Sequence, residues 1–227
     1  IAVHSMKDLP SETAPGLCIG AVLPREDPHD VLISRNGQGF GELPAHAVIG
    51  TSSLRRIAQL KSRRPDLNMV DLRGNVETRI RKLHDEKLDG IVLAYAGVKR
   101  LGFASSITEI LPYDLVLPAA GQGCVAVEAR SDDRETLDMV NKINHWQSQY
   151  AVLAERAFLK TLEGGCQVPV ACLAEVKDRQ IELRGLVASL AGDTMVRGHN
   201  YGSLDKAEEV GRELGLELLK QGAGQVL

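Results

Sequence analysis

The chain has 227 residues, of which 44% are hydrophobic, 25% charged and only 4% aromatic, and its formal net charge is −3. This composition is typical of a soluble globular protein with one or two domains. The acidic balance argues against a general nucleic-acid binder, because such proteins usually carry a basic excess. The sequence holds no apolar run of about 18 residues and no charged-then-apolar leader, so we expect no membrane span and no signal peptide. The four cysteines follow no CxxC spacing, so we expect no metal site. We expect a cytoplasmic protein whose thiols are reduced.

The first 23 residues have the pattern of two apolar strands joined by the loop 4–10. Ile1, Ala2 and Val3 resemble the middle of a buried strand rather than the start of a chain. We therefore expect that an N-terminal piece is missing from this lobe.

Strands and helices alternate in the middle of the chain. Short apolar runs at 47–50, 68–72 and 90–94 are each followed by residues at helical spacing. Ser53 and Asn75 stand where they would cap the first two helices, and a third, short helix is expected after Gly97. This alternation predicts a parallel sheet covered by helices.

The strand pattern at 121–130 returns the chain to the first lobe. A chain that leaves a lobe, builds an inserted unit and comes back has two hinge crossings, predicted near 24–28 and 118–123. The predicted domains are domain 1 from 1–25 and 119–143, domain 2 from 26–118, and domain 3 from 144–227.

Domain 3 is predicted to be a small α+β unit. An amphipathic helix from Gln147 is expected to stop at the glycines 164–165. Three strand-like runs at 168–175, 181–189 and 195–201 follow, with a closing helix over 205–220.

Two arginines occupy an unfavourable place at the start of the first central helix. Arg55 and Arg56 lie in its first turn, where cations oppose the helix dipole. A bound carboxylate or phosphate would explain them, because a helix N-terminus offers free N–H donors and guanidinium groups bind such anions in pairs of hydrogen bonds. The alternative is a solvated or salt-bridged surface pair.

Further arginines favour the anion site. Arg73, Arg79 and Arg100 are expected near the same carboxyl edge of the sheet, where ligands of parallel sheets bind. Like charges gathered there repel one another unless an anion joins them, so we expect a ligand with several separated acidic groups. A nucleotide is less attractive, because the sequence has no GxxxxGK[ST] loop.

Two other residues are candidates for chemistry. Cys166 follows two glycines on a predicted loop, where it is either a nucleophile or attachment point, or a small buried residue. Asp8 follows Lys7 at the end of the first strand, where it is either catalytic or a turn-forming residue before Pro10. Cys172, inside a predicted strand, is expected to be buried.

Five motifs in order along the chain carry a resemblance to a known family. They are VHSMKDLP at 3–10, GTSSLRR at 50–56, LRGNV at 72–76, LPAAGQG at 117–123 and LEGGCQVP at 162–169. Together they closely resemble the porphobilinogen deaminase family, also called hydroxymethylbilane synthases.

The resemblance implies a fold and a reaction. The implied fold is α/β, with two periplasmic-binding-protein-like lobes, of which the first is incomplete here, and a small α+β C-terminal domain. The implied enzyme is a transferase of porphyrin and heme biosynthesis that joins porphobilinogen head-to-tail into the linear tetrapyrrole hydroxymethylbilane and releases ammonia. The family also implies a cytoplasmic monomer. Since the expected N-terminal stretch is absent, we expect the chain as given to be inactive.

The resemblance also implies roles for individual residues. Cys166 would hold a dipyrromethane cofactor through a thioether, and Asp8 would be the catalytic carboxylate. The residues that would bind the cofactor are Ser5, Lys7, Thr51, Ser52, Ser53, Arg55, Arg56 and Gln122. The residues that would bind the substrate are Arg73, Arg79 and Arg100.

The implied chemistry suits these residue types. Porphobilinogen carries an acetate and a propionate, so a growing oligopyrrole is a polyanion of the expected kind. A carboxylate such as Asp8 stabilises the methylene cation that remains after ammonia leaves. Two alternatives are a non-enzymatic two-lobed protein that binds polycarboxylates, and nucleic-acid binding through 55–64. The scarcity of aromatic residues argues against the second.

Overall fold

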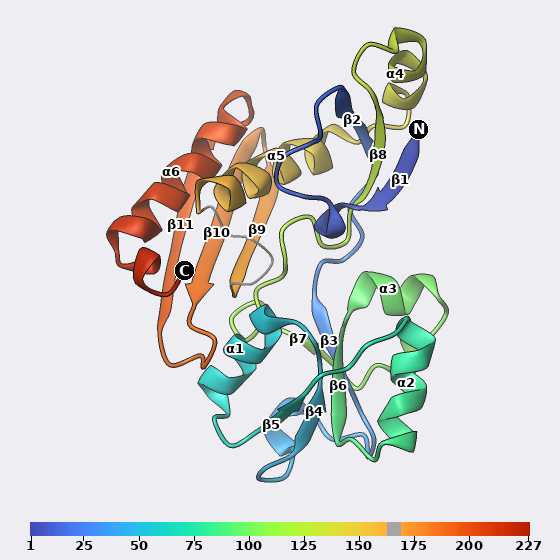
Figure 1. Ribbon diagram of the computed structural model, residues 1–227, viewed down its shortest axis with the longest axis vertical. Coiled ribbons are helices and arrows are strands. Elements are labelled where there is room, and N and C mark those ends of the chain that lie inside the picture. Colours follow the sequence, from blue (N-terminus) through green and yellow to red (C-terminus); the bar gives the residue numbers. More distant parts are fainter. Residues whose placement is uncertain (163–168) are drawn as a thin grey trace.

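The computed structural model describes residues 1–162 and 169–227, whose strands form three separate sheets. Figure 1 shows the sheet at the N-terminus above, the sheet of the central residues below it, and the C-terminal sheet at their side. This is a mixed α/β fold with two lobes and a third, α+β domain, as expected.

The first sheet joins the two ends of the predicted first lobe. Its strands are β1 (Ala2–Ser5), β2 (Leu17–Val22) and β8 (Val125–Arg130), in the order β1-β8-β2 with antiparallel pairing throughout. Helix α4 (Arg134–Asn141) packs on it through Val140, which contacts Ala21 and Val127. The pairing of residues 1–23 with 121–130 is therefore confirmed.

The central sheet is mixed rather than parallel. Its strands are β3 (Asp30–Ser34), β4 (Val48–Gly50), β5 (Asn68–Val70), β6 (Gly90–Ala94) and β7 (Glu109–Leu111), in the order β5-β4-β6-β3-β7. Strands β4, β5 and β6 are parallel, whereas β3 runs antiparallel to β6 and β7. The parallel arrangement predicted for the strands at 47–50, 68–72 and 90–94 is thus confirmed, whereas β3 runs opposite to the other four strands of the sheet. Asp30, the first residue of β3, pairs with Ala94, the last residue of β6. The chain therefore enters the central lobe from the hinge at the carboxyl edge of the parallel strands, and β3 runs in the direction opposite to β6.

The helices of the central lobe begin where their caps predict. They are α1 (Leu54–Arg63), α2 (Val76–Asp85) and α3 (Tyr95–Arg100). The Ser53 and Asn75 side chains accept hydrogen bonds from the third residue of α1 and α2 respectively, which confirms both caps. Helix α3 starts at Tyr95 and so already contains Gly97, after which the helix was expected to begin.

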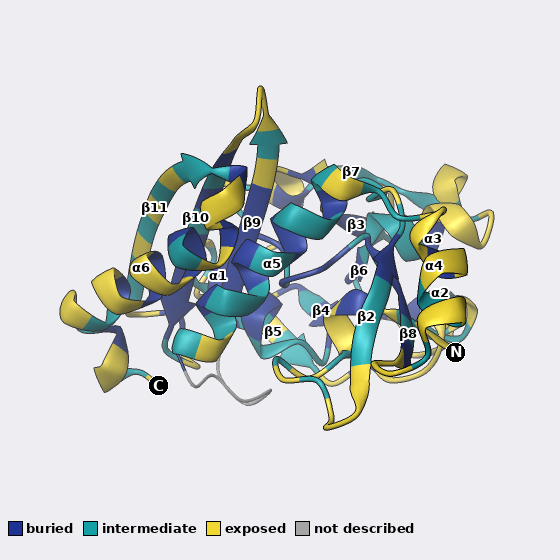
Figure 2. Ribbon diagram, turned by 90° about the horizontal axis from the view of Figure 1, so that it is seen from above, coloured by how far each residue is buried: buried dark blue, intermediate teal, exposed yellow. Residues whose placement is uncertain are grey.

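The third sheet is an antiparallel meander covered on one face by two helices. Its elements are α5 (Trp146–Thr161), β9 (Val170–Lys177), β10 (Gln180–Ala188), β11 (Met195–Ser203) and α6 (Ala207–Lys220). Figure 2 shows buried residues gathered where α5 meets β9 and β10, and fully buried Phe158 lies in this core. The closing helix begins at Ala207, after a single 3-10 turn, rather than at residue 205. The glycines predicted to end α5 lie outside the described residues.

The two hinge crossings run side by side. The backbone N–H of Leu23 donates to Val125 O, and that of Glu26 to Gly123 O, both at 3.0 Å. Domain 3 holds this hinge through Glu155 on α5, which is fully buried. Its carboxylate accepts hydrogen bonds from Arg25 Nη1 (2.6 Å), Gly121 N (2.6 Å) and Ala174 N (2.8 Å). One buried carboxylate therefore ties both crossings to the third sheet.

Candidate active site

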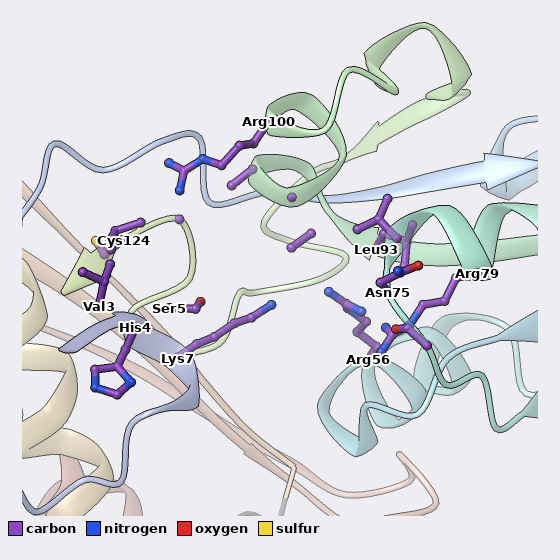
Figure 3. A pocket seen from close by; sticks show the side chains of 17 residues that line it. Val3, His4, Ser5, Lys7, Arg56, Asn75, Arg79, Leu93, Arg100 and Cys124 are labelled. Carbon is purple, nitrogen blue, oxygen red and sulfur yellow. The ribbon is translucent and has the colours of Figure 1, made fainter. Parts of the chain in front are cut away.

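A hollow of about 460 Å³ lies between the first sheet and the helices of the central lobe. Strand β1 and the loop before β8 form one wall, and α2, α3 and the end of β6 form the other. Figure 3 shows Ser5 and Lys7 on the first wall facing Arg56, Arg79 and Arg100 across it. The carboxyl edge of the parallel strands thus opens onto the first lobe, where ligands of such sheets bind.

The charge of the hollow has one sign. Lys7, Arg56, Arg79 and Arg100 line it, and none of the described lining residues is Asp or Glu. The N-terminus of α2, with Asn75 and Val76 in the lining, adds the positive end of a helix dipole. This set of groups is suited to a ligand that carries several carboxylates.

Arg55 and Arg56 are buried rather than exposed on the surface, and only Arg56 reaches the hollow. Both are buried, with exposed fractions of 6% and 5%, and both donate to Asp30, which is fully buried. Arg55 Nη1 donates to Asp30 Oδ2 at 2.6 Å and to Leu117 O at 2.7 Å, and Arg55 is absent from the lining of the hollow. Arg56 reaches the lining. The alternative of a surface salt bridge is therefore wrong, because the anion that offsets the helix dipole is a buried carboxylate of the protein itself.

Gln122 belongs to the same buried network. Its Nε2 donates to Asp30 Oδ1 at 3.0 Å and to Pro28 O at 2.7 Å, and its backbone carbonyl accepts from Arg25 Nε at 2.9 Å. The side chain is buried at the hinge and is not among the lining residues of the hollow.

Lys7 and Asp8 follow one another on a 3-10 turn, Met6–Asp8, after β1. By surface area Lys7 is exposed, yet its ammonium group reaches into the hollow towards Arg56 (Figure 3). Removal of this group from water, together with the positive charge of Arg56, lowers the pKa of Lys7 to about 8. Asp8 is exposed and lies outside the lining, next to Lys7.

Of the hydroxyl residues predicted to bind the cofactor, Ser5 lines the hollow, whereas Thr51, Ser52 and Ser53 make local contacts away from it. Thr51 is buried, and its Oγ1 accepts from Ser53 N at 3.3 Å. Ser52 Oγ donates to Leu72 O at 2.7 Å, which joins the end of β4 to the neighbouring strand segment, and Ser53 caps α1. These contacts shape the turn from which Arg56 projects.

Arg73 also lies apart from the hollow. It is exposed, and its Nε donates to Asp71 at 3.0 Å. Arg79 and Arg100 are thus the members of the predicted substrate-binding set that the structure brings into the lining.

The cysteines fall into different settings. Cys166 lies outside the described residues. Cys172 is buried in β9, as predicted, and burial raises the pKa of its thiol well above its usual range. Cys124, which was not singled out from the sequence, lines the hollow and is also buried.

Sequence reasoning missed the buried carboxylates of this region. Asp30 and Glu155 were not predicted to matter, although they anchor Arg55, Arg56 and Arg25. No local pattern marks them, because their arginine partners lie 25 or more residues away in the chain.

Comparison with known proteins decides the family. Residues 1–138 match the family model described as "Porphobilinogen deaminase, dipyromethane cofactor binding domain", and residues 149–220 match "Porphobilinogen deaminase, C-terminal domain". The chain belongs to the porphobilinogen deaminase family. All 227 residues align at 60% identity with the porphobilinogen deaminase of Syntrophomonas wolfei, covering 74% of that protein. The corresponding enzymes of Pelotomaculum thermopropionicum and Carboxydothermus hydrogenoformans are 54% and 53% identical over the same residues, with 73% of each covered.

Membership in this family establishes the reaction and the cofactor. The chain is a porphobilinogen-polymerising transferase that uses dipyrromethane. The hollow fits that group, because dipyrromethane bears acetate and propionate arms and the lining offers cations without a competing carboxylate.

Proposed function

We propose that the hollow between the two lobes is where the porphobilinogen deaminase reaction takes place. The observation that carries this proposal is the gathering of Lys7, Arg56, Arg79 and Arg100 around one hollow whose described lining has no acidic residue. Four cations confined in this way repel one another until carboxylates enter, so binding of a polycarboxylate relieves that repulsion.

The roles of the residues follow from their places in the hollow. Arg56, Arg79 and Arg100 would hold the acetate and propionate arms, and Lys7 and Ser5 would contact the ligand from the opposite wall. Thr51, Ser52, Ser53, Arg55 and Gln122 would support this site through the turn before α1 and the hinge. Arg73, exposed beside α2, would meet carboxylates of a longer product.

The chemistry assigned to Asp8 is the handling of charge and protons. In each cycle the C–N bond of the aminomethyl group breaks, ammonia leaves, and a methylene cation remains on the substrate. A new C–C bond then forms to a pyrrole α-carbon, which loses its proton. We assign to Asp8 the stabilisation of the cation and the removal of this proton. When bound through Cys166, dipyrromethane supplies the α-carbon to which the first substrate is joined.

Intact mass spectrometry and turnover together test the proposal. We expect the purified protein to carry the added mass of one dipyrromethane, and Cys166→Ser to lack it. Asp8→Asn should keep the added mass, and in a chain of the relatives' full length it should lose most turnover of porphobilinogen. A non-enzymatic polycarboxylate binder would have the bare polypeptide mass and would be indifferent to both substitutions.

Oligomeric state and location are further parts of the proposal. Among residues 1–162 and 169–227, no helix has the length and hydropathy needed to cross a membrane. We propose a cytoplasmic monomer on the strength of the family resemblance. Light scattering on a size-exclusion column tests the monomer, and a mass near twice that of the chain would contradict it.

A further inference from the structure

Asp30 is a buried carboxylate that touches two adjacent arginines. It is the first residue of β3 and has no exposed surface. Its Oδ2 accepts from Arg55 Nη1 at 2.6 Å, and its Oδ1 accepts from Arg56 Nη2 at 2.6 Å and Arg56 Nε at 3.0 Å. Gln122 Nε2 adds a further hydrogen bond to Oδ1 at 3.0 Å. Every oxygen of this carboxylate is therefore used inside the protein.

These contacts fix the direction of the Arg56 guanidinium group. Its Nε and Nη2 are held by Asp30, and its Nη1 donates to Val92 O at 2.9 Å. One N–H on each terminal nitrogen is left over, and Figure 3 shows the group facing Lys7 across the hollow. A guanidinium clamped on one edge in this way presents its other edge to a ligand with little loss of rotational freedom.

Asp30 itself does not reach the hollow. It is absent from the lining, while Arg56 is present. Burial opposes the charge on Asp30, but Arg55 and Arg56 outweigh that effect and hold the pKa of the carboxyl well below its usual range. The carboxylate is thus ionised at any pH at which the enzyme would work, and it can act on a ligand only through its arginine neighbours.

We infer that Asp30 is the positioning residue for ligand binding, because it aims the Arg56 guanidinium at the carboxylates that enter the hollow. Arg55 donates to the other oxygen of the Asp30 carboxylate, and Gln122 links this carboxylate to the hinge at Pro28. The inference rests on the proposed function, since it assumes that porphobilinogen binds in this hollow.

Positioning and simple charge balance predict opposite effects of neutralising Asp30. Asp30→Asn makes the region around the hollow more positive by one charge. If charge alone governed affinity, porphobilinogen would bind more tightly. If Asp30 positions Arg56, the released guanidinium loses its direction and binding weakens in spite of the added positive charge.

Equilibrium binding of porphobilinogen to the 227-residue chain, measured by titration calorimetry, tests the inference. We expect Asp30→Asn to raise Kd about tenfold, the loss that accompanies one charge-assisted hydrogen bond. In an Arg56→Gln background the same substitution should change Kd little, because its effect passes through Arg56. Asp89→Asn is the matched control, since it breaks an ion pair with Arg35 in the same lobe away from the hollow, and should leave Kd unchanged.

Circular dichroism of each variant shows whether it folds. If Asp30→Asn does not fold, Asp30→Glu decides, because it keeps the charge but displaces the carboxylate by one methylene and should raise Kd severalfold. Tighter or unchanged binding in the folded Asp30 variants, or an equal loss in the Arg56→Gln background, would overturn the inference. Absence of any binding to the unsubstituted chain would instead refute the proposed function of the hollow.

Discussion

Replacement of Glu155 by glutamine is expected to cause a large loss of stability. The side chain has no exposed surface, and its partner Arg25 retains a side-chain exposure of only 12%. Burial opposes the charge on Arg25, but Glu155 outweighs it and raises the pKa of the guanidinium. Glutamine has nearly the same volume, but its single amide oxygen can accept from only one of Gly121 N and Ala174 N, because its NH₂ group is a donor. Arg25 is left as a buried charge without its counter-ion.

The size of the effect follows from this geometry. Breaking a buried ion pair by removing one partner costs about 3–5 kcal/mol, because an uncompensated charge stays behind. For a chain of 150–250 residues each kcal/mol lowers Tm by about 2–4 °C, so Tm should fall by roughly 6–20 °C. Differential scanning calorimetry at neutral pH measures this shift.

Glu12→Gln is the control for the Glu155 variant. It also removes a carboxylate partner of a cation, Lys160, but both side chains of this pair are exposed. Solvent already screens such a pair, so Tm should hardly change. A fall of less than about 2 °C for Glu155→Gln, or an equal fall for both variants, would refute the argument that the buried carboxylate holds the hinge.

Three further predictions concern the hollow and the third domain. As pH rises through about 8, Lys7 loses its charge, because its lowered pKa leaves it cationic only below that value. Porphobilinogen binding should therefore weaken over this pH range. Lys7→Arg should abolish this pH dependence in calorimetric titrations. Arg100→Gln should raise Kd for porphobilinogen about fivefold, since one carboxylate contact is lost; an unchanged Kd would remove Arg100 from the site. Gly211→Ala should lower Tm by roughly 5 °C, because the added Cβ would lie 2.1 Å from Ala154 O where α5 and α6 cross. Gly41→Ala is the control, since a Cβ added there has no atom within 4 Å, and its Tm should be unchanged.

Local signals in the sequence were enough to locate most elements of the fold. Ser53 and Asn75 mark the starts of α1 and α2, because a cap depends only on residues within one helical turn. The strand-like runs at 168–175, 181–189 and 195–201 were likewise sufficient to predict β9, β10 and β11. The direction of β3 was not predictable in this way, since it depends on where the hinge delivers the chain.

The charged residues of the candidate site could also be predicted only in part from the sequence. From the unfavourable position of Arg55 and Arg56 at a helix start we expected a bound anion, whereas the anion that the structure shows beside them is Asp30. Asp30 is brought to Arg55 and Arg56 by the tertiary structure. The residues next to Asp30 in the sequence therefore give no sign of these hydrogen bonds. The buried location of Arg55 could therefore not be foreseen, while the approach of Arg79 and Arg100 to one edge could.

The sulfur in the wall of the hollow has a consequence for the fidelity of the reaction. Cys124 packs among Met6, Val22 and Ala126, and burial raises the pKa of its thiol to about 12. At neutral pH almost none of it is thiolate, the form that attacks electrophiles. Since porphobilinogen becomes an electrophile once ammonia leaves, an ionised sulfur here would be alkylated and would trap substrate as a dead-end adduct. If the reaction takes place in this hollow as proposed, the apolar packing of Cys124 keeps its sulfur protonated, and this thiol does not compete for the growing chain.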